Sequence, residues 1–337
     1  MKEQLHDFII NFSSVLWEAM PFIVLGAIVA GILEEFLPQQ AITRFLPKSV
    51  VPSVMIGAML GLIFPMCECG IVVVMRRLLR KGLPLSCCIA YMLAGPIING
   101  VVIASTAVAF IPHGIGGEVI GLRVGLGFLV AVVTGLVVHG QWVKHGTSLL
   151  NPIAMPPPAK RPEIDPPTTV DEAERAGLNP DAIPGRPIPR RPFMHRLGNI
   201  SATALHDFVD ITVFLILGAV LAALVRQYIS TQEIEELSRN QPLLAIPVMM
   251  LMAVLMCLCS EADAFVAASF TKMHISAKIA FLVLGPMLDL KLLIMYTRVF
   301  RFRLIATIVV CVVLQVLIYC FAVHLIYQMN GWTGVPK

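Results

Sequence analysis

The chain has 337 residues, of which 57% are hydrophobic and only 14% are charged, and its mean hydropathy is +0.83. Soluble domains carry about one quarter charged residues, so this composition excludes an ordinary soluble protein and indicates a membrane protein. The net charge of +4 comes from basic residues in short loops between apolar runs and gives no indication of nucleic-acid binding. Leu-, Val-, Ile- and Ala-rich runs without strand-like alternation predict helices that cross the ~30 Å hydrocarbon core.

The first apolar run follows the segment MKEQLHDF, which has a single lysine and two acids. Because no convincing cleavage site follows it, we expect a mature first helix and not a removable signal. Eight apolar runs in all are predicted to span the membrane. Their approximate bounds are 10–36, 50–75, 84–110, 118–139, 207–229, 242–270, 276–297 and 303–328.

A proline-rich, polar segment separates the fourth predicted span from the fifth. Its prolines forbid regular helix and its polarity leaves it no core to bury, so we expect a disordered linker. The predicted organisation is a first transmembrane repeat at 1–140, the linker at 141–205 and a second transmembrane repeat at 206–337.

An internal repeat becomes visible when the chain is divided at the linker. Met66-Cys67-Glu68-Cys69 is matched by Met256-Cys257-Leu258-Cys259, and in each case a Gly-Pro pair follows 28 residues after the first cysteine, at Gly95 and Gly285. The segment Phe22 to Gly26 is likewise matched by Phe214 to Gly218. Duplicated helical halves with a substrate site between them are typical of secondary transporters. The predicted fold class is therefore an all-α polytopic membrane protein of about eight transmembrane helices in two pseudo-symmetric halves.

The orientation of the two halves stays open at this stage. With eight spans and an inside N-terminus, the basic loop 76–81 and the linker fall on the cytoplasmic side, as basic loops usually do. Arg298, Arg301 and Arg303 then fall on the opposite side. An odd number of crossings in each half would invert the halves and lessen this conflict.

Polar residues at membrane depth gather around the repeated motifs. Because an unpaired carboxylate in hydrocarbon costs at least ~2.5 kcal/mol, such acids should face a cavity, a cation or a partner. Pro65, Gly95-Pro96 and Gly285-Pro286 predict helices broken near the midplane, where unwound backbone can hold ions. The predicted binding residues are Cys67, Glu68, Cys69, Asn99, Cys257, Cys259, Glu261, Asp263 and Asp289, with Lys291 close by.

The donor types restrict the substrate that we expect. Thiolates select Cu(I), Zn(II) and similar soft ions, whereas Na⁺, Mg²⁺ and Ca²⁺ sites use oxygen alone; trivalent arsenic shares the affinity for thiols. Metal binding to thiols and acids displaces protons, which predicts proton-coupled antiport. No nucleotide-binding loop is present, no catalytic residue or cofactor is predicted, and the metal is cargo. We therefore expect a transporter and not an enzyme, with the lipid bilayer as partner and homo-oligomerisation left open.

Simpler explanations exist for several of these residues. Cys87, Cys88, Cys311 and Cys320 lie in apolar runs without nearby acids and are expected to pack as small hydrophobic side chains. Glu261 and Asp263 could pair with Lys272 or Lys291 instead of binding metal. Asn99 could cap or cross-link helices through its amide.

The motifs resemble those of a known family. The segments that carry the resemblance are MCECG at 66–70, MRRLLRKG at 75–82, AGPIIN at 94–99 and CLCSEADAF at 257–265. They resemble the predicted permeases related to the ArsP organoarsenical exporter, and most closely the branch of copper/zinc efflux transporters of the bacterial inner membrane. The resemblance covers nearly the whole chain except the linker. It implies a multi-pass permease of eight or slightly more helices that exports toxic thiophilic species on its membrane cysteines.

Three functions are therefore weighed. The leading hypothesis is a secondary exporter of Cu(I) or Zn(II), with the two halves rocking around a midplane site. The second is an exporter of trivalent organoarsenicals, which would need the thiols but not the acids and would confer arsenic resistance. The third is an intramembrane thiol oxidoreductase, which is disfavoured because thiol exchange needs an exposed cysteine of low pKa.

Overall fold

The computed structural model describes residues 2–36, 47, 49–64, 66–151, 242–271 and 273–331, together with helical residues scattered between 201 and 224. Apart from those scattered residues, the predicted span 207–229 lies outside the described part, and so do linker residues 152–200 and the side chain of Cys69. In the described part every regular element is helical, with one isolated bridge between Leu150 and Phe300. This confirms the predicted all-α class.

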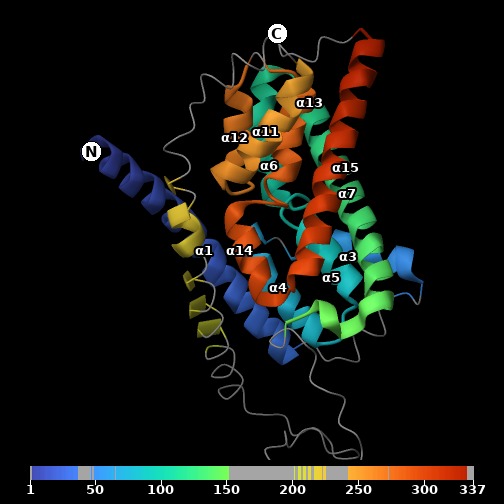
Figure 1. The fold of residues 1–337 in the computed structure, drawn as a ribbon. Helices are drawn as coiled ribbons and strands as arrows, with labels where there is room; N and C mark the ends of the chain where they lie inside the picture. Colours follow the sequence, from blue (N-terminus) through green and yellow to red (C-terminus); the bar gives the residue numbers. More distant parts are fainter. Residues whose placement is uncertain are drawn as a thin grey trace, which may run out of the picture.

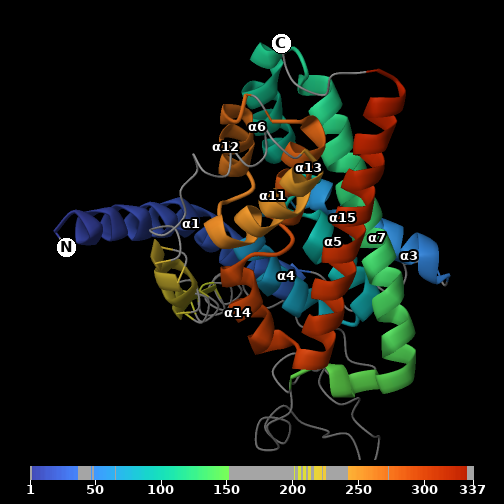
Figure 2. The ribbon, with the colours of Figure 1, turned by 45° about the horizontal axis from the view of Figure 1, so that its top comes forward.

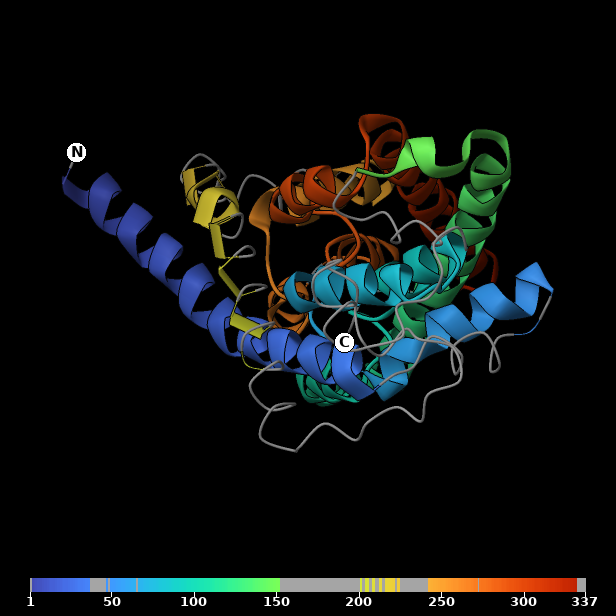
Figure 3. The same cartoon turned by 90° about the horizontal axis from the view of Figure 1, so that it is seen from below.

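Thirteen helical elements follow one another along the described chain. The first group is α1 (Lys2–Phe36), α3 (Val50–Ile63), α4 (Glu68–Arg80), α5 (Leu85–Ala94), α6 (Gly100–Phe110), η1 (Ile111–His113), α7 (Gly116–His145) and η2 (Gly146–Leu149). The second group is α11 (Pro242–Met256), α12 (Ala262–Ser269), α13 (Ile275–Leu284), α14 (Leu290–Val299) and α15 (Phe302–Met329). The N-terminal part of α1 extends away from the body of the molecule (Figure 3).

Two long helices, α7 and α15, lie side by side and antiparallel (Figures 1 and 2). Gln141 donates to Thr307 at one end of the pair, and Gln315 donates to Thr134 further along. Among the described residues these two helices alone are both long and apolar enough to cross a membrane. The eight predicted spans are therefore not all reproduced as single membrane-length helices.

Four of the predicted spans are each divided into two shorter helices. The span 84–110 becomes α5 and α6, and 276–297 becomes α13 and α14, each divided at a Gly-Pro pair. The spans 50–75 and 242–270 are divided beside the two cysteine motifs. A proline lacks the N–H that an uninterrupted helix needs and clashes with the preceding turn, which explains the divisions at Gly95-Pro96 and Gly285-Pro286.

Two hairpins of short helices, α4–α5 and α12–α13, lie at opposite ends of the molecule. Figure 1 shows α4, α5 and α14 in its lower half and α6, α12 and α13 in its upper half. A Cβ on Gly135, late in α7, would lie 3.0 Å from the Ser86 carbonyl oxygen near the start of α5. At the other end, His274, which caps α13, packs on His324 near the end of α15.

This geometry resolves the orientation conflict of the eight-span topology. The turn 81–84 lies toward the end of α7, and Leu150, just beyond that end, pairs with Phe300. The two arginine groups, predicted on opposite sides, therefore lie at one end of the molecule. Between them in the chain, the half-length helices α11 and α12 meet near Gly285 and return the chain to the end at which α11 begins. We call the end that holds both arginine groups the basic end; its described lysines and arginines are Arg76, Arg77, Arg80, Lys81, Lys144, Arg298, Arg301 and Arg303.

Candidate functional site

The polar residues predicted from sequence lie at the N-terminal ends of four short helices. Glu68 is the first residue of α4 and Asp263 the second residue of α12. Asn99 and Asp289 are the N-caps of α6 and α14, where their side-chain oxygens accept from the backbone N–H groups of Val102 and Leu292 at 2.9 and 2.6 Å. Helix N-termini present unpaired N–H groups and partial positive charge, so all four positions favour an oxygen-bearing side chain.

One buried ammonium group, that of Lys291, joins several of these residues. Its Nζ donates to Glu68 Oε1 at 2.9 Å and to the Cys257 carbonyl oxygen at 3.2 Å. Asp289 Oδ2 lies 3.6 Å from the same nitrogen, and Cys259 Sγ lies 3.9 Å from it. Lys291, Glu68 and Asp289 are fully buried. The two cysteine-motif segments thus meet at a lysine surrounded by oxygen and sulfur atoms, which we call the Lys291 centre.

The carboxylates of the Lys291 centre retain acceptor capacity. Glu68 Oε2 and Asp289 Oδ2 are buried and have no hydrogen-bond partner among the described residues. The 3.6 Å between Asp289 Oδ2 and Lys291 Nζ is an electrostatic contact and exceeds hydrogen-bonding distance. Buried oxygen atoms without donors are costly, so their persistence in one place indicates a site that can accept another donor or a cation.

The described cysteines of the motifs lie at the helix breaks and form no disulfide with one another. Cys67, Cys257 and Cys259 are all buried. Cys257 has φ of 50°, in the left-handed region, and is the one non-glycine residue with positive φ in the described ranges. Its Sγ lies 3.4 Å from the Val254 carbonyl oxygen, while its own carbonyl accepts from Lys291.

Two matched glycines allow helices to approach the Lys291 centre closely. A Cβ on Gly26 of α1 would lie 3.0 Å from the Gly70 Cα, two residues beyond Glu68. A Cβ on Gly218 would lie 2.6 Å from the Lys291 Cβ. Gly26 and Gly218, which end the two repeated Phe-to-Gly segments of the sequence, therefore lie in close contact with the helices that carry Glu68 and Lys291.

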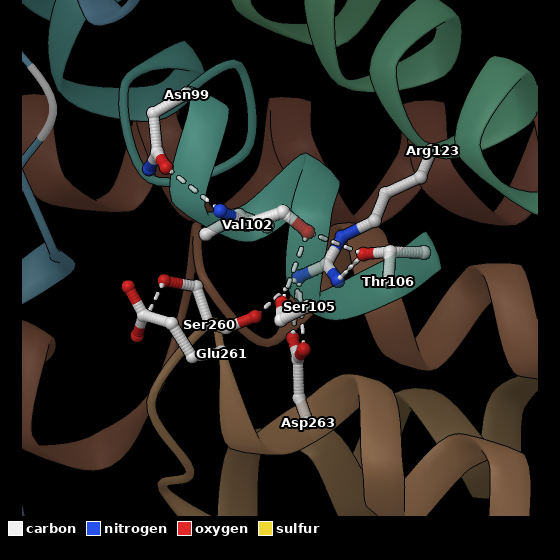
Figure 4. A network of polar contacts seen from close by, with 8 residues as sticks. All are labelled: Asn99, Val102, Ser105, Thr106, Arg123, Ser260, Glu261 and Asp263. Atoms are coloured by element: carbon white, nitrogen blue, oxygen red, sulfur yellow. Dashed lines mark hydrogen bonds and ion pairs between the residues drawn. The ribbon is translucent and has the colours of Figure 1, made fainter. Parts of the chain in front are cut away.

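A second buried ion pair lies between α7 and α12 (Figure 4). Arg123 Nη2 lies 2.9 Å from both Asp263 oxygens and 2.9 Å from the Ser260 carbonyl oxygen. Arg123 Nη1 donates to Thr106 Oγ1 at 2.8 Å, and that hydroxyl donates to the Val102 carbonyl. We call these residues the Arg123 centre; they link α6, α7 and α12.

Glu261 lies beside the Arg123 centre, next to Ser260. It is partly exposed, its Oε2 lies 3.5 Å from Ser260 Oγ, and Figure 4 shows it turned away from Arg123. The alternative pairing of the two acids with Lys272 or Lys291 is therefore replaced, for Asp263, by a pairing with Arg123. Lys272 lies outside the described residues.

The buried acidic side chains are accompanied by buried basic side chains. The buried acids are Glu68, Asp263 and Asp289, and the buried cations are Arg76, Arg123, Lys278 and Lys291. In the part of the chain that the structure describes, no three His, Cys, Asp or Glu side chains are arranged to hold a metal ion together. Metal coordination by the predicted residues would thus require Lys291 to leave its place.

Sequence reasoning overlooked two of these cations. Arg123 and Lys278 each stand alone within an apolar run, and a charge inside a membrane segment is itself a functional signal. Lys278 Nζ has no hydrogen-bond partner among the described residues and lies 5.9 Å from the centroid of the Phe110 ring. The signal was present in the sequence for both residues, although their partners could not be read from it.

Three of the four cysteines expected to serve packing are buried, whereas Cys311 is partly exposed. Cys87 Sγ donates to the Ser53 carbonyl oxygen at 3.1 Å, between α5 and α3. Cys88 and Cys320 are buried in α5 and α15. Within the described part of the chain, none of these three forms a hydrogen bond with Lys291 or Arg123.

Comparison with known proteins identifies the family. The predicted-permease family ArsP_1 matches residues 4–325. The chain belongs to the ArsP_1 family. The UPF0718 protein YcgR of Bacillus subtilis is 33% identical over 307 residues, covering 91% of this chain and 93% of the relative. A putative two-component membrane permease complex subunit of Streptococcus mutans is 31% identical over 313 residues, covering 93% of each. No solved structure matches the chain.

Membership of the ArsP_1 family makes the chain a membrane permease, as its apolar helices and broken spans indicate. The permease resemblance found in the sequence is thereby confirmed at the level of the family. The copper/zinc branch stays a prediction.

Proposed function

We propose that this ArsP_1 permease exports a thiophilic cation of the class of Cu(I) or Zn(II), and that the Lys291 ammonium occupies the place of that cation in the structure described here. The observation that supports the proposal is the surroundings of Lys291 Nζ. Glu68 Oε1, the Cys257 carbonyl and Asp289 Oδ2 lie within 3.6 Å of it, and Cys259 Sγ lies at 3.9 Å. A positive charge is thus already held by mixed oxygen and sulfur donors.

The donor set restricts the exchanging cation. Thiolate and carboxylate together suit Zn(II), and thiolate with few other donors suits Cu(I), whereas a hard cation would gain nothing from sulfur. A lysine is suited to give way because its ammonium sits on a flexible four-carbon stem. When Lys291 withdraws, Glu68 Oε2 and Asp289 Oδ2 supply acceptor sites that are unoccupied by donors.

The arrangement of short helices supports an inverted-repeat mechanism for this proposal. In each half a short helix after the cysteine motif packs on a short helix of the other half, α4 on α14 and α12 on α6. The α4–α5 and α12–α13 hairpins lie at opposite ends of the molecule (Figure 1). Transporters with such inverted repeats alternate access by rocking one repeat against the other around a central site. Metal binding to thiols releases protons, so we propose proton exchange as the driving reaction.

The test is metal accumulation in a metal-sensitive bacterial host that expresses the chain, grown on copper, zinc or methylarsenite. Expression of the wild-type chain should lower cellular copper or zinc, and Cys259→Ser should abolish the effect. The matched control is Cys320→Ala, which removes a buried thiol in α15 and should leave accumulation at the wild-type level. Unchanged copper and zinc content on expression would exclude the metal-exporter function.

Export of trivalent organoarsenicals is the second candidate, and one observation favours it. The buried acids are already paired with Lys291 and Arg123, so a neutral substrate could bind the thiols without displacing a cation. Glu68→Gln and Asp289→Asn distinguish the two candidates. Methylarsenite resistance that survives both substitutions, in cells whose metal content the chain does not change, would establish the arsenical function instead.

A further inference from the structure

We propose that an anionic phospholipid binds at the basic end, in a pocket between η2 and the junction of α14 with α15. The pocket has a volume of about 630 Å³. Its polar lining comes from Ser148, Asn151, Thr297, Arg301 and Arg303. The inference needs only a membrane-embedded chain and is independent of which substrate the permease carries.

The walls of the pocket are fixed by backbone contacts. Asn151 N donates to the Val299 carbonyl, and Arg301 N donates to the Leu149 carbonyl, each at 3.0 Å. The side chain of Asn151 also donates to the Thr297 carbonyl at 2.7 Å. The junction between the two long-separated segments is therefore preformed and does not depend on a ligand for its shape.

The charge of the pocket is positive and uncompensated. Arg301 and Arg303 are exposed, their side chains form no ion pair or hydrogen bond in the described part of the chain, and no acid is among the described residues that line the pocket. Guanidinium groups bind phosphate in a bidentate manner, which favours a phosphodiester headgroup as the ligand. Basic loops face the cytoplasm in most membrane proteins, and the cytoplasmic leaflet is where anionic lipids attract such groups.

An apolar groove continues from this pocket along α15. It has a volume of about 540 Å³ and is lined by Phe302, Arg303, Ala306, Thr307, Val310 and Cys311. These positions recur every three or four residues, so they form one stripe on the helix surface. Phe302 and Arg303 line both pocket and groove.

Because the pocket and the groove are continuous, a ligand that carries both a phosphate and an apolar chain fits them best. A phosphate bound to Arg301 and Arg303 would place its acyl chain along the stripe from Ala306 to Cys311, deeper in the membrane. Free phosphate would use the pocket but leave the groove unused. The pocket adjoins the end of α14, the helix that carries Lys291 at its start.

The experiment measures thermal unfolding of the purified full chain in detergent with added phosphatidylglycerol, phosphatidylcholine or inorganic phosphate at matched ionic strength. Phosphatidylglycerol should raise the midpoint by about 2–4 °C, because a ligand that binds only the folded state stabilises it. Phosphatidylcholine and inorganic phosphate should leave the midpoint unchanged. An equal rise with phosphatidylcholine, a rise with phosphate alone, or no rise with phosphatidylglycerol would overturn the proposal.

Two variants locate the effect. Arg301→Gln/Arg303→Gln should remove the phosphatidylglycerol shift, whereas Arg80→Gln/Lys144→Gln, which alters the same end but not the pocket lining, should retain it. Ala306→Trp fills the apolar groove and should reduce the shift while both arginines remain. A full shift in either pocket or groove variant, or loss of the shift in the control, would contradict this lipid site.

Discussion

The Lys291 and Arg123 centres are both buried ion pairs that join the first part of the chain to the second, yet they are built differently. Arg123 lies 2.9 Å from both oxygens of Asp263 and also bonds Ser260 and Thr106. The planar guanidinium thus has several short contacts in a fixed geometry. Lys291 has contacts that lengthen from 2.9 Å to 3.9 Å, and two neighbouring carboxylate oxygens remain without donors.

This difference distinguishes a fixed ion pair from one whose cation can be exchanged. A guanidinium held on several sides cannot leave without exposing a buried carboxylate, whereas an ammonium with one short carboxylate contact can be replaced by another cation. The thiols lie only at the exchangeable centre, since Cys259 contacts Lys291 and no cysteine contacts Arg123 among the described residues. We therefore expect mutations at the Arg123 centre to affect folding and mutations at the Lys291 centre to affect transport.

The largest expected effect is loss of stability at the Arg123 centre. Asp263→Ala leaves a buried guanidinium without its partner and should destabilise the protein by about 3–5 kcal/mol. Thermal unfolding of the purified protein in detergent measures this loss. Arg123→Met/Asp263→Leu should recover most of the midpoint, because both charges are then absent. If Asp263→Ala has the unfolding midpoint of the wild type, Arg123 does not belong to a fixed ion pair.

A smaller stability loss with a larger transport defect is expected at the Lys291 centre. Lys291→Met leaves Glu68 and Asp289 without their cation, and the loss should stay below that of Asp263→Ala because a bound metal ion or a proton can neutralise these carboxylates. The carboxylates and thiols freed from Lys291 should then retain copper or zinc. Elemental analysis should therefore find more metal per chain in Lys291→Met than in the wild type. The control is Lys278→Met, which removes a buried lysine outside both centres and should not increase the metal content. Equal metal in Lys291→Met and wild type would argue against exchange at this position.

The two N-caps provide a third and smaller test. Asn99→Ala removes the acceptor for Val102 N–H and should cost about 1 kcal/mol. Asp289→Asn keeps an acceptor for Leu292 N–H but removes the charge next to Lys291, so the unfolding midpoint should change little while metal transport falls. Equal transport by Asp289→Asn and wild type would restrict Asp289 to helix capping.

The smallest effect is expected at Ser260. Arg123 binds its carbonyl oxygen, and its hydroxyl reaches Glu261 only at 3.5 Å. Ser260→Ala keeps the backbone contact and should shift the free energy of unfolding by less than about 0.5 kcal/mol. A larger shift in thermal unfolding would show that the hydroxyl contributes to the Arg123 centre.

Local sequence signals predicted the interruptions in the helices well. Proline and glycine act on the backbone of their own turn, so Gly95-Pro96 and Gly285-Pro286 could be interpreted without knowing their neighbours. The same holds for the capping of α6 by Asn99, which was one of the two interpretations of that residue. That the chain turns back between α3 and α4 and between α11 and α12 could not be predicted, because hydropathy measures the length of an apolar run and not the direction of the chain.

The partners of the buried charges could not be predicted in the same way. Arg123 and Asp263 are 140 residues apart, and Lys291 and Glu68 are 223 apart, so no local pattern links them. The acids were expected to face a cavity, a cation or a partner, but which arginine or lysine lies beside each acid depends on which helices pack together. The motif predicts Cys67, Cys257 and Cys259 as binding residues, and their role as ligands stays a prediction.

The backbone of Cys257 places a limit on how stable this protein can become. A side chain in the left-handed region costs of order 1–3 kcal/mol that glycine would not incur, and this conformation aims the Cys257 carbonyl at Lys291. A glycine at this position would relieve the strain and at the same time remove the thiol. Sequences of this family selected only for heat resistance should therefore drift toward glycine at residue 257, whereas selection in a metal-rich medium should retain cysteine.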